Sequence, residues 1–306
     1  MRTVARYALI VVAAAAARAF AQAPADVELT RAPLRLEVST QARALQPGEL
    51  VLVRARTSAP VDSVTGSSSL GSLRFFRTSD PLAWEALLGL DLAVKPGPYT
   101  ITITAATPGG SAAAAITMRV LAKTFPSRRI TVDPKFLNPP ASELPRIERE
   151  AKLLAEVLAK VSAARAWSTP FVAPVPGPPT SGFGRVSVIN GVRRTPHVGT
   201  DFKAAVGTPV RAPAAGTVVL SESLYYAGDA VLIDHGLGFF SMLVHLSKRR
   251  TQAGDAVEAG EVIGLSGATG RITGPHLHWT ARLGSARIDP MSVLAVLGER
   301  AAGESR

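Results

Sequence analysis

The chain has 306 residues, of which 47% are hydrophobic, and its formal net charge is +11. That length is comfortable for two domains, and the composition supplies enough apolar side chains for a sizeable core. The chain contains no cysteine, which excludes disulfides, thiol nucleophiles and zinc sites built from cysteine.

Residues 1–21 have the pattern of a secretory signal peptide. Arg2 and Arg6 form a positively charged start, an apolar run follows from Tyr7 to Ala17, and Ala19-Phe20-Ala21 matches an A-x-A cleavage site. The apolar run is too short to span a bilayer, which needs about 20 residues. We therefore expect an exported protein, periplasmic or otherwise secreted, that begins at Gln22 and keeps no stable membrane anchor after cleavage.

The positive charge persists without this segment. Cleavage would remove three arginines and no acid, so the formal charge would fall from +11 to +8. A basic exported protein is suited to an anionic partner. We expect no nucleic-acid partner, because the chain has neither an aromatic-interleaved basic stripe nor a nucleic-acid motif. The anionic polymer outside a bacterial membrane is the cell wall; a general basic bias of the proteome is the alternative explanation.

Residues 22–122 are predicted to form an N-terminal β-module. Short alternating segments, separated by turn residues, lie at 34–38, 50–56, 99–104 and 115–120. Such strands over about 95 residues indicate an antiparallel sandwich of immunoglobulin-like type. The segment contains no histidine and no clustered acid pair, so we interpret it as a binding or regulatory module.

Residues 123–169 are predicted to be a linker and a connecting helix. The stretch 123–140 is basic and interrupted by proline, which indicates a connection across the surface. From residue 142 to about 167, apolar residues recur near the helical period. Ser142 is the expected N-cap, and Pro145 is tolerable in the first turn.

Residues 170–296 are β-rich and dense in glycine, and residues 297–306 are expected to be a flexible tail. Two segments, 206–212 and 253–259, echo each other, and each is followed by a glycine and an apolar pair. They predict two similar turn-and-strand units in one all-β domain. This domain also holds all five histidines of the chain: His197, His235, His245, His276 and His278.

His276 and His278 follow a Gly-Pro turn signal and alternate with apolar residues. On a strand, residues two apart share a face and lie about 6.6 Å apart along the chain. The two imidazoles would then lie side by side, while Leu277 and Trp279 pack on the opposite face. Two ordinary surface histidines would have the same pattern, so this stretch alone leaves both interpretations open.

His197 and Asp201 are four residues apart, in His-Val-Gly-Thr-Asp. On an ideal strand they would be about 13 Å apart, too far for one metal ion unless the chain bends. Gly199 between them permits such a bend. Two histidines and a carboxylate form a ligand set that hydrolytic zinc uses, with a fourth position open to water.

The remaining histidines have other expected places. In the pair His276 and His278, one imidazole can bind the metal while the other reaches the water or the substrate, and spacing does not decide which. His245 alternates with apolar residues on an expected strand and is a further candidate for this site. His235 precedes a glycine turn, and we expect a structural or rim role for it.

The segments HVGTD at 197–201, DHGLGFFSMLVHL at 234–246 and GATGRITGPHLHW at 267–279 resemble peptidase family M23, the lysostaphin- and LytM-type zinc endopeptidases of the cell wall. The flanking segments 181–185 and 207–219 match as well, and the resemblance is dense over about 170–292. It implies a mainly β chain with a C-terminal antiparallel β peptidase domain. The preceding β-module and helix resemble the N-terminal region of some exported Gram-negative members.

Carried over by motif, the resemblance implies that His197, Asp201 and His278 bind one zinc ion per chain. It implies that His245 and His276 are the catalytic pair that orders the water and stabilises the tetrahedral intermediate.

Two departures from the family pattern stand out. Leu243 occupies a position that is often aromatic, and we expect only a mild packing change there. Some members carry a tyrosine shortly before the first histidine as an oxyanion donor, whereas residues 191–196 contain none. Oxyanion stabilisation would then fall mainly on the histidines.

The predicted function is that of a secreted zinc metalloendopeptidase acting on peptidoglycan cross-links, with the D-alanyl-diaminopimelate bond as the expected target. A glycyl-glycine endopeptidase is the alternative among enzymes. A non-catalytic LytM-type activator of cell-wall amidases is the alternative outside them, since some relatives have lost ligands. The retention of all three ligands and both catalytic histidines favours an enzyme. The sequence leaves open the oligomeric state, the ligand of the N-terminal module and whether the protein is autoinhibited.

Overall fold

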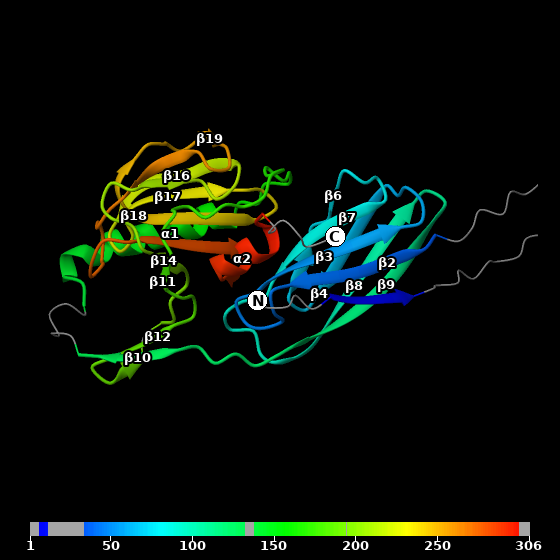
Figure 1. Cartoon of the computed structure of the whole chain (residues 1–306), viewed down its shortest axis with the longest axis horizontal. Helices are drawn as coiled ribbons and strands as arrows, with labels where there is room; N and C mark the ends of the chain where they lie inside the picture. Colours follow the sequence, from blue (N-terminus) through cyan, green and yellow to red (C-terminus); the bar gives the residue numbers. More distant parts are fainter. Residues whose placement is uncertain (1–5, 12–33, 132–137, 194, 300–306) are drawn as a thin grey trace, which may run out of the picture.

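The computed structural model describes residues 6–11, 34–131, 138–193 and 195–299. The predicted cleavage site, Gln22 and residues 300–306 lie outside these ranges. Figure 1 shows two β-rich bodies side by side, with the N-terminal module at one end and the C-terminal domain at the other. The mainly β fold with antiparallel sheets is confirmed.

The N-terminal module is a sandwich of two antiparallel sheets that enclose one apolar core. One sheet has the strand order β1 (Arg6–Val11), β2 (Leu36–Ala42), β3 (Leu50–Thr57), β7 (Ala83–Gly89) and β6 (Phe76–Arg77). The other has the order β5 (Gly71–Leu73), β4 (Ser63–Ser68), β8 (Gly97–Thr107) and β9 (Gly110–Val120). Strict alternation of buried and exposed residues along β9 gives this sheet its inner face. The immunoglobulin-like type of the sandwich stays a prediction.

β1 lies within the residues predicted as a signal peptide. Its backbone pairs antiparallel with β2, so it forms the edge of the first sheet. Removal of residues 1–21 on export would leave β2 at that edge. The signal peptide stays a prediction.

The connector contributes a strand to the C-terminal domain. The prediction of a connection across the surface did not include this strand. β10 (Ser127–Ile130) pairs in parallel with β12 (Val186–Ile189), which pairs in turn with β13 (Val192–Arg193). These three strands form a small separate sheet near β11 and β14 (Figure 1). Parallel pairing joins segments distant in sequence, so local patterns did not reveal it.

The connecting helix α1 spans Leu144–Ala159 and is shorter than predicted. The prediction of Ser142 as N-cap is wrong, because residues 141–143 form a 3₁₀ turn and the cap position is Glu143. Pro145 lies in the first turn, as predicted. The helix does not reach residue 167, because Lys160 is extended. The backbone after the helix forms hydrogen bonds with the domain instead. Leu237 N–H donates to the Ser162 carbonyl oxygen, and Ala166 N–H donates to the His235 carbonyl oxygen.

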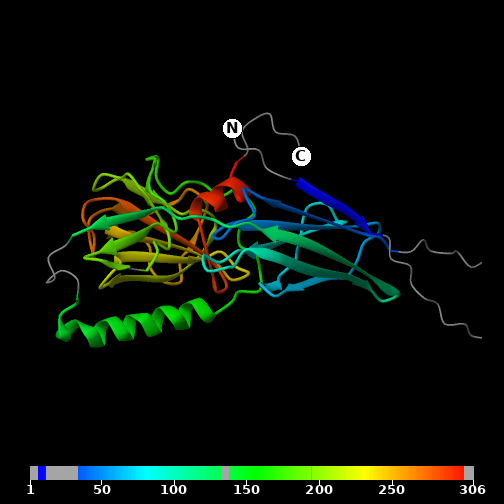
Figure 2. The same ribbon diagram turned by 90° about the horizontal axis from the view of Figure 1, so that it is seen from below.

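α1 packs on the C-terminal domain along its apolar stripe. Figure 2 shows the helix running along one side of that domain. Leu153, Leu154, Val157 and Leu158 pack against an apolar cluster from β16 (Gly216–Leu224), β17 (Gly228–Asp234) and β18 (Phe239–Arg249). The helix thereby covers a sheet face that would otherwise be in water.

The C-terminal domain is built on a large antiparallel sheet. Its main path is β11 (Pro179–Ser181), β14 (Thr200–Phe202), β21 (Leu277–Leu283), β18, β17, β16 and β19 (Ala256–Val257). Three further strands join this path: β15 (Pro209–Arg211), β20 (Val262–Ser266) and β22 (Ala286–Ile288). The two echoing segments form similar units, as predicted: Gly207 (φ 88°) precedes β15, and Gly254 (φ 100°) precedes β19.

The module and the C-terminal domain share apolar core at their junction. Leu50, Leu52 and Leu87 of the module belong to the same buried cluster as Ile288 and Val293 of the domain. Val293 lies in the last helix, α2 (Pro290–Leu297), which sits between the two bodies in Figure 1. The two parts are therefore packed against each other and not merely tethered; the predicted domain limits stay predictions.

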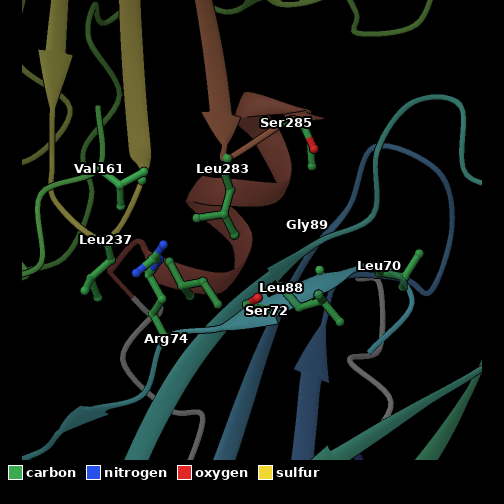
Figure 3. Close-up of a pocket in the computed structure, with 14 residues that line it drawn as sticks. Leu70, Ser72, Arg74, Leu88, Gly89, Val161, Leu237, Leu283 and Ser285 are labelled. Carbon is green, nitrogen blue, oxygen red and sulfur yellow. The ribbon is translucent and has the colours of Figure 1, made fainter. Parts of the chain in front are cut away.

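A cavity of about 250 Å³ also lies at this junction (Figure 3). Leu88 and Gly89 line it from the module, and Leu237 and Leu283 line it from the domain. No histidine or acid lines it, so it does not belong to the site described below. Within the described ranges, no helix combines the length and the apolar character needed to cross a membrane.

Candidate metal centre and adjacent histidines

Three neighbouring strands bring most of the predicted site residues together. Asp201 on β14 and His278 on β21 are direct partners in an antiparallel ladder. On the other side of β21, His278 pairs with Val244 of β18, the residue before His245. Long-range pairing therefore places motifs about 80 and 35 residues apart in one cluster.

His197 reaches Asp201 through the predicted bend. The chain bends at Gly199 before β14 begins at Thr200, and His197 Nε2 lies 3.1 Å from Asp201 Oδ1. A Cβ atom at position 199 would lie 2.4 Å from the Trp279 carbonyl oxygen and 2.6 Å from His278 Nε2. Only glycine lets the segment approach β21 so closely.

His197, Asp201 and His278 form a set that fits a metal ion. His278 Nδ1 is 2.8 Å from Asp201 Oδ1 and 3.0 Å from His197 Nε2. Within the described part of the chain, they are the residues whose nitrogen and oxygen atoms converge in this way. Tetrahedral ligands of zinc at about 2.0–2.2 Å lie about 3.3 Å from one another, close to these separations. Two imidazoles and a carboxylate are the donors of many catalytic zinc sites.

Outer hydrogen bonds orient these two imidazoles. His197 Nδ1 donates to the Gly182 carbonyl oxygen at 3.1 Å. A carbonyl oxygen only accepts, so Nδ1 carries the proton and Nε2 offers its lone pair inward. His278 Nε2 lies 3.0 Å from Thr280 Oγ1, which can accept Nε2–H and leave Nδ1 for a metal.

His245 and His276 form a second pair beside this set, with ring centroids 5.0 Å apart. His245 Nδ1 donates to the Thr269 carbonyl oxygen at 2.9 Å, and His276 Nδ1 donates to the Gly274 carbonyl oxygen at 2.8 Å. In the neutral form of each ring, Nε2 therefore lacks a proton and can accept one. His276 Nε2 is 3.5 Å from Asp201 Oδ1, so the pair adjoins the candidate ligands.

One detail of the strand prediction needs correction. His276 precedes β21, which begins at Leu277, and it forms only an isolated bridge with Gly267. Its hydrogen bond to Gly274 holds it in the turn that the Gly-Pro pair creates. The alternation itself is as predicted, because Leu277 and Trp279 are fully buried on the opposite face.

His245 lies where β18 changes its partner strand. Val244 pairs with His278 of β21, whereas Leu246 pairs with Ser266 of β20. Between them His245 has φ 64°, a left-handed conformation that costs about 1–3 kcal/mol for a residue other than glycine. Its N–H donates to the Ala227 carbonyl oxygen instead of to the ladder. The kink therefore aims the His245 ring at the histidine cluster.

The charge states follow from burial and hydrogen bonding. Burial alone would raise the pKa of the Asp201 carboxyl, but hydrogen bonds from His197 and His278 outweigh it and hold this pKa well below its usual range. Burial lowers the pKa of His245 to about 4, and it lowers the pKa of His278 as well. At neutral pH the site therefore combines an ionised carboxylate at Asp201 with neutral rings at His245 and His278, and an ionised carboxylate and a neutral imidazole are the forms that bind metals.

His235 is the one histidine that the structure does not bring to this cluster. It is fully buried, its Nδ1 donates to the Ala215 carbonyl oxygen at 2.9 Å, and its ring packs edge-on against Phe171. Burial lowers its pKa to about 4. Its surroundings are those of a core residue, in line with the expected structural role.

Sequence reasoning missed three supporting residues: Gly182, Thr269 and Thr280. Thr280 had a usable signal, since it lies two residues after His278 and shares its strand face. Gly182 and Thr269 act through backbone carbonyls, which every residue type has, so the sequence does not indicate such a role.

The comparisons with known proteins point to one family. The model of peptidase family M23 matches residues 195–290. The chain is 48% identical over 87 residues to the peptidoglycan DD-endopeptidase ShyA of Vibrio cholerae, covering 28% of this chain and 20% of that protein. It is 45% identical over 97 residues to the DD-carboxypeptidase/endopeptidase Mpg of Neisseria meningitidis, covering 32% of this chain and 22% of that protein. These matches thus span about a fifth of the curated relatives' length.

The similarity to a solved structure is more extensive. A peptidase M23 from Pseudomonas aeruginosa is 30% identical to this chain and has a TM-score of 0.63. The match covers 83% of this chain and 96% of that one. It therefore extends well beyond the segment that carries the histidines.

Proposed function

This chain belongs to peptidase family M23, and we propose that it is an exported zinc endopeptidase that hydrolyses amide bonds in the peptide cross-links of peptidoglycan. The observation that carries the proposal is the convergence of His197, Asp201 and His278 beside His245 and His276. The names of two curated relatives, a peptidoglycan DD-endopeptidase and a DD-carboxypeptidase/endopeptidase, favour a bond made by a D-amino acid. The D-alanyl-diaminopimelate cross-link is such a bond, and the periplasm is the compartment that holds it.

His197 Nε2, Asp201 Oδ1 and His278 Nδ1 would hold one zinc ion per chain. When bound, zinc lowers the pKa of water towards 7 and polarises a carbonyl group. Asp201 contributes the negative charge of the ligand set, since its hydrogen bonds keep it ionised. The Gly182 carbonyl and the Thr280 hydroxyl keep the two ligand rings in position.

The second histidine pair supplies proton transfer and hydrogen bonding. His245 accepts a proton from the attacking water at Nε2, since Nδ1–H is held by the Thr269 carbonyl, and later gives it to the leaving amine. A protonated His276 keeps its Nδ1–H on the Gly274 carbonyl and donates from Nε2 to the developing oxyanion. With no tyrosine at 191–196, these imidazoles carry the oxyanion interaction.

Digestion of purified cell wall, with products identified by mass, tests the proposal. We expect wild-type protein to release D-alanyl-diaminopimelate cleavage products, chelator to stop the release, and added zinc to restore it. His278→Ala should lose both zinc and hydrolysis, whereas His245→Ala should keep zinc and lose hydrolysis, by on the order of 10²-fold or more.

The alternatives give different results. Normal digestion by metal-stripped or His278→Ala protein would falsify the metal mechanism. Cleavage of pentaglycine bridges alone would indicate a glycyl-glycine endopeptidase. No hydrolysis, together with stimulation of a wall amidase, would indicate a non-catalytic activator.

A further inference from the structure

The small sheet beside the candidate site presents two arginines on one face. Arg128 on β10 lies opposite Ser187 on β12, and its Nε donates to Ser187 Oγ at 3.3 Å. Arg185 precedes Ser187 by two residues, and Val186 between them is buried, so Arg185 shares the face of Ser187 and Arg128. Residues from the connector and from the C-terminal domain therefore form one basic surface.

This basic surface adjoins the candidate metal ligands through the backbone. The Arg185 carbonyl oxygen accepts a hydrogen bond from His197 N–H at 3.0 Å, and Gly184 N–H donates to the His197 carbonyl oxygen at 2.7 Å. The backbone of His197 is thus hydrogen-bonded to both Gly184 and Arg185. Arg185 therefore lies next to a candidate metal ligand in the backbone hydrogen-bond network.

In the part of the chain that the structure describes, neither arginine is ion-paired, although the charge of Asp201 acts on Arg185. Among the described residues, no carboxylate forms an ion pair with Arg128 or Arg185, although Arg185 is half-buried. The pKa of Arg185 is lowered by burial and by the charge of Arg128, and raised in part by Asp201. Two like charges held close to each other without an ion-paired carboxylate among the described residues favour an anion between them, and guanidinium groups match a carboxylate in shape and hydrogen bonding.

We propose that Arg185 and Arg128 form a subsite that binds a free carboxylate of the substrate peptide. The inference rests on the proposed function, because it takes the peptide stem of peptidoglycan as the substrate. Such stems carry free carboxylates on glutamate and on diaminopimelate, and amidation removes their charge. Because β10 comes from the connector, recognition of the carboxylate depends on residues outside the segment that matches the family model, 195–290.

Full-length protein and defined cross-linked peptide dimers provide the test. Three substrates are compared: unmodified, amidated on the diaminopimelate carboxylate, and amidated on the glutamate carboxylate. For the wild type, we expect amidation of one of the two groups to raise KM on the order of fivefold with kcat unchanged, the size of a partly exposed ion pair. The amidated substrate with the raised KM identifies which carboxylate the subsite binds.

Arg185→Gln and Arg128→Gln should raise KM for the unmodified dimer to a similar extent. In each variant, amidation of the recognised carboxylate should raise KM less than it does in the wild type, because one of the two partner charges is already gone. Arg119→Gln, at an exposed position on β9 of the module, is the matched control and should behave as wild type. Zinc content and thermal unfolding confirm that each variant is folded.

Two outcomes overturn the inference while leaving the proposed function intact. One is equal KM for all three substrates with the wild type. The other is unchanged discrimination between free and amidated substrates in Arg185→Gln and Arg128→Gln. Hydrolysis of none of the substrates by wild-type protein would instead overturn the proposed function, and the subsite with it.

Discussion

Gly199 and His235 show how single residues constrain this domain. Gly199 lies in the bend that brings His197 to Asp201, and its missing side chain leaves room for the Trp279 carbonyl and the His278 ring. His235 fills the core, where burial opposes its protonation. Gly199 is required because it has no side chain, and His235 fits the core because it stays uncharged there.

Gly199→Ala should disrupt the candidate metal centre. The added methyl group would meet the Trp279 carbonyl at 2.4 Å, so β14 or the His278 ring must shift. We expect zinc affinity to fall on the order of tenfold or more and hydrolysis to fall with it. Gly182→Ala is the control, since a Cβ atom there meets nothing within 4 Å and the Gly182 carbonyl still accepts from His197. Equal zinc affinity in the two variants, measured by competition with a chromophoric chelator, would refute the steric argument.

His235 should make the fold less stable in mild acid. Its pKa is about 4 in the folded chain, against 6.5 for an unperturbed histidine. Between these values the unfolded chain binds a proton that the folded chain does not, so stability falls as the pH drops from about 6.5 to 4. The full loss is about 3 kcal/mol.

Urea unfolding at pH 7.5 and pH 5, in the presence of chelator, measures this effect. His245 and His278 shift in the same direction, so the informative quantity is the difference between wild type and His235→Gln. The variant should be less stable at pH 7.5, because packing is lost, but should show a smaller drop towards pH 5. If the free energy of unfolding falls equally in both proteins between pH 7.5 and pH 5, the low pKa of His235 is contradicted.

Among the structural elements, the loop between β20 and β21 positions His245. The Thr269 carbonyl accepts from His245 Nδ1, while the Thr269 hydroxyl accepts from Asp229 N–H at 2.9 Å and donates to the Leu246 carbonyl at 2.7 Å. One residue therefore ties the loop to Asp229 of β17 and to His245 and Leu246 of β18, at the kink. The strained φ of His245 is held by these neighbouring contacts.

Thr269→Val should impair hydrolysis without removing the metal. The valine keeps the carbonyl but loses both hydroxyl hydrogen bonds, so the loop and the His245 ring are less well held. We expect kcat to fall about tenfold to a hundredfold, with zinc content and KM nearly unchanged. Thr269→Ser restores the hydroxyl and should recover most of the activity. Loss of zinc in Thr269→Val, or no recovery with serine, would show a general structural defect instead.

At the scale of the whole molecule, a partly buried ionic contact joins the module to the domain beside their shared apolar core. The Arg43 guanidinium donates to Glu49 of the module and to Asp289 at the N-cap of α2, each at 2.7 Å. Asp289 Oδ1 also accepts from the Thr200 hydroxyl at 3.3 Å, and Thr200 precedes Asp201. Hydrogen bonds therefore connect the N-terminal module to the residue beside a candidate ligand. Lys123 of the connector adds a further contact to Glu49.

Arg43→Met should destabilise the full chain by about 3 kcal/mol, because it leaves the carboxylate of Glu49 buried with only one cationic partner. Arg56→Met is the matched control: its pair with Asp80 is exposed, and its loss should cost less than about 1 kcal/mol. Denaturant unfolding measures both. Equal stability of the two variants would show that the junction contact contributes no more than a surface pair.

Much of the fold and of the candidate site could be predicted because it is encoded locally. Alternation over 99–104 and 115–120 indicated β8 and β9, and the glycine turns indicated the units at β15 and β19. The histidine–aspartate spacing around Gly199 indicated how two candidate ligands could meet. In each case the relevant atoms lie within a few residues of one another, so residue type and period suffice.

Hydrogen bonds between distant segments carried no local signal. The end of α1 at Ala159, the pairing of β10 with β12 and the apolar core shared by module and domain all depend on partners far along the chain. The sequence by itself determined which side chains are available for metal and proton chemistry. The tertiary structure alone decided which nitrogen of each imidazole faces inward, because outer partners such as the Gly182 and Thr269 carbonyls set the tautomer.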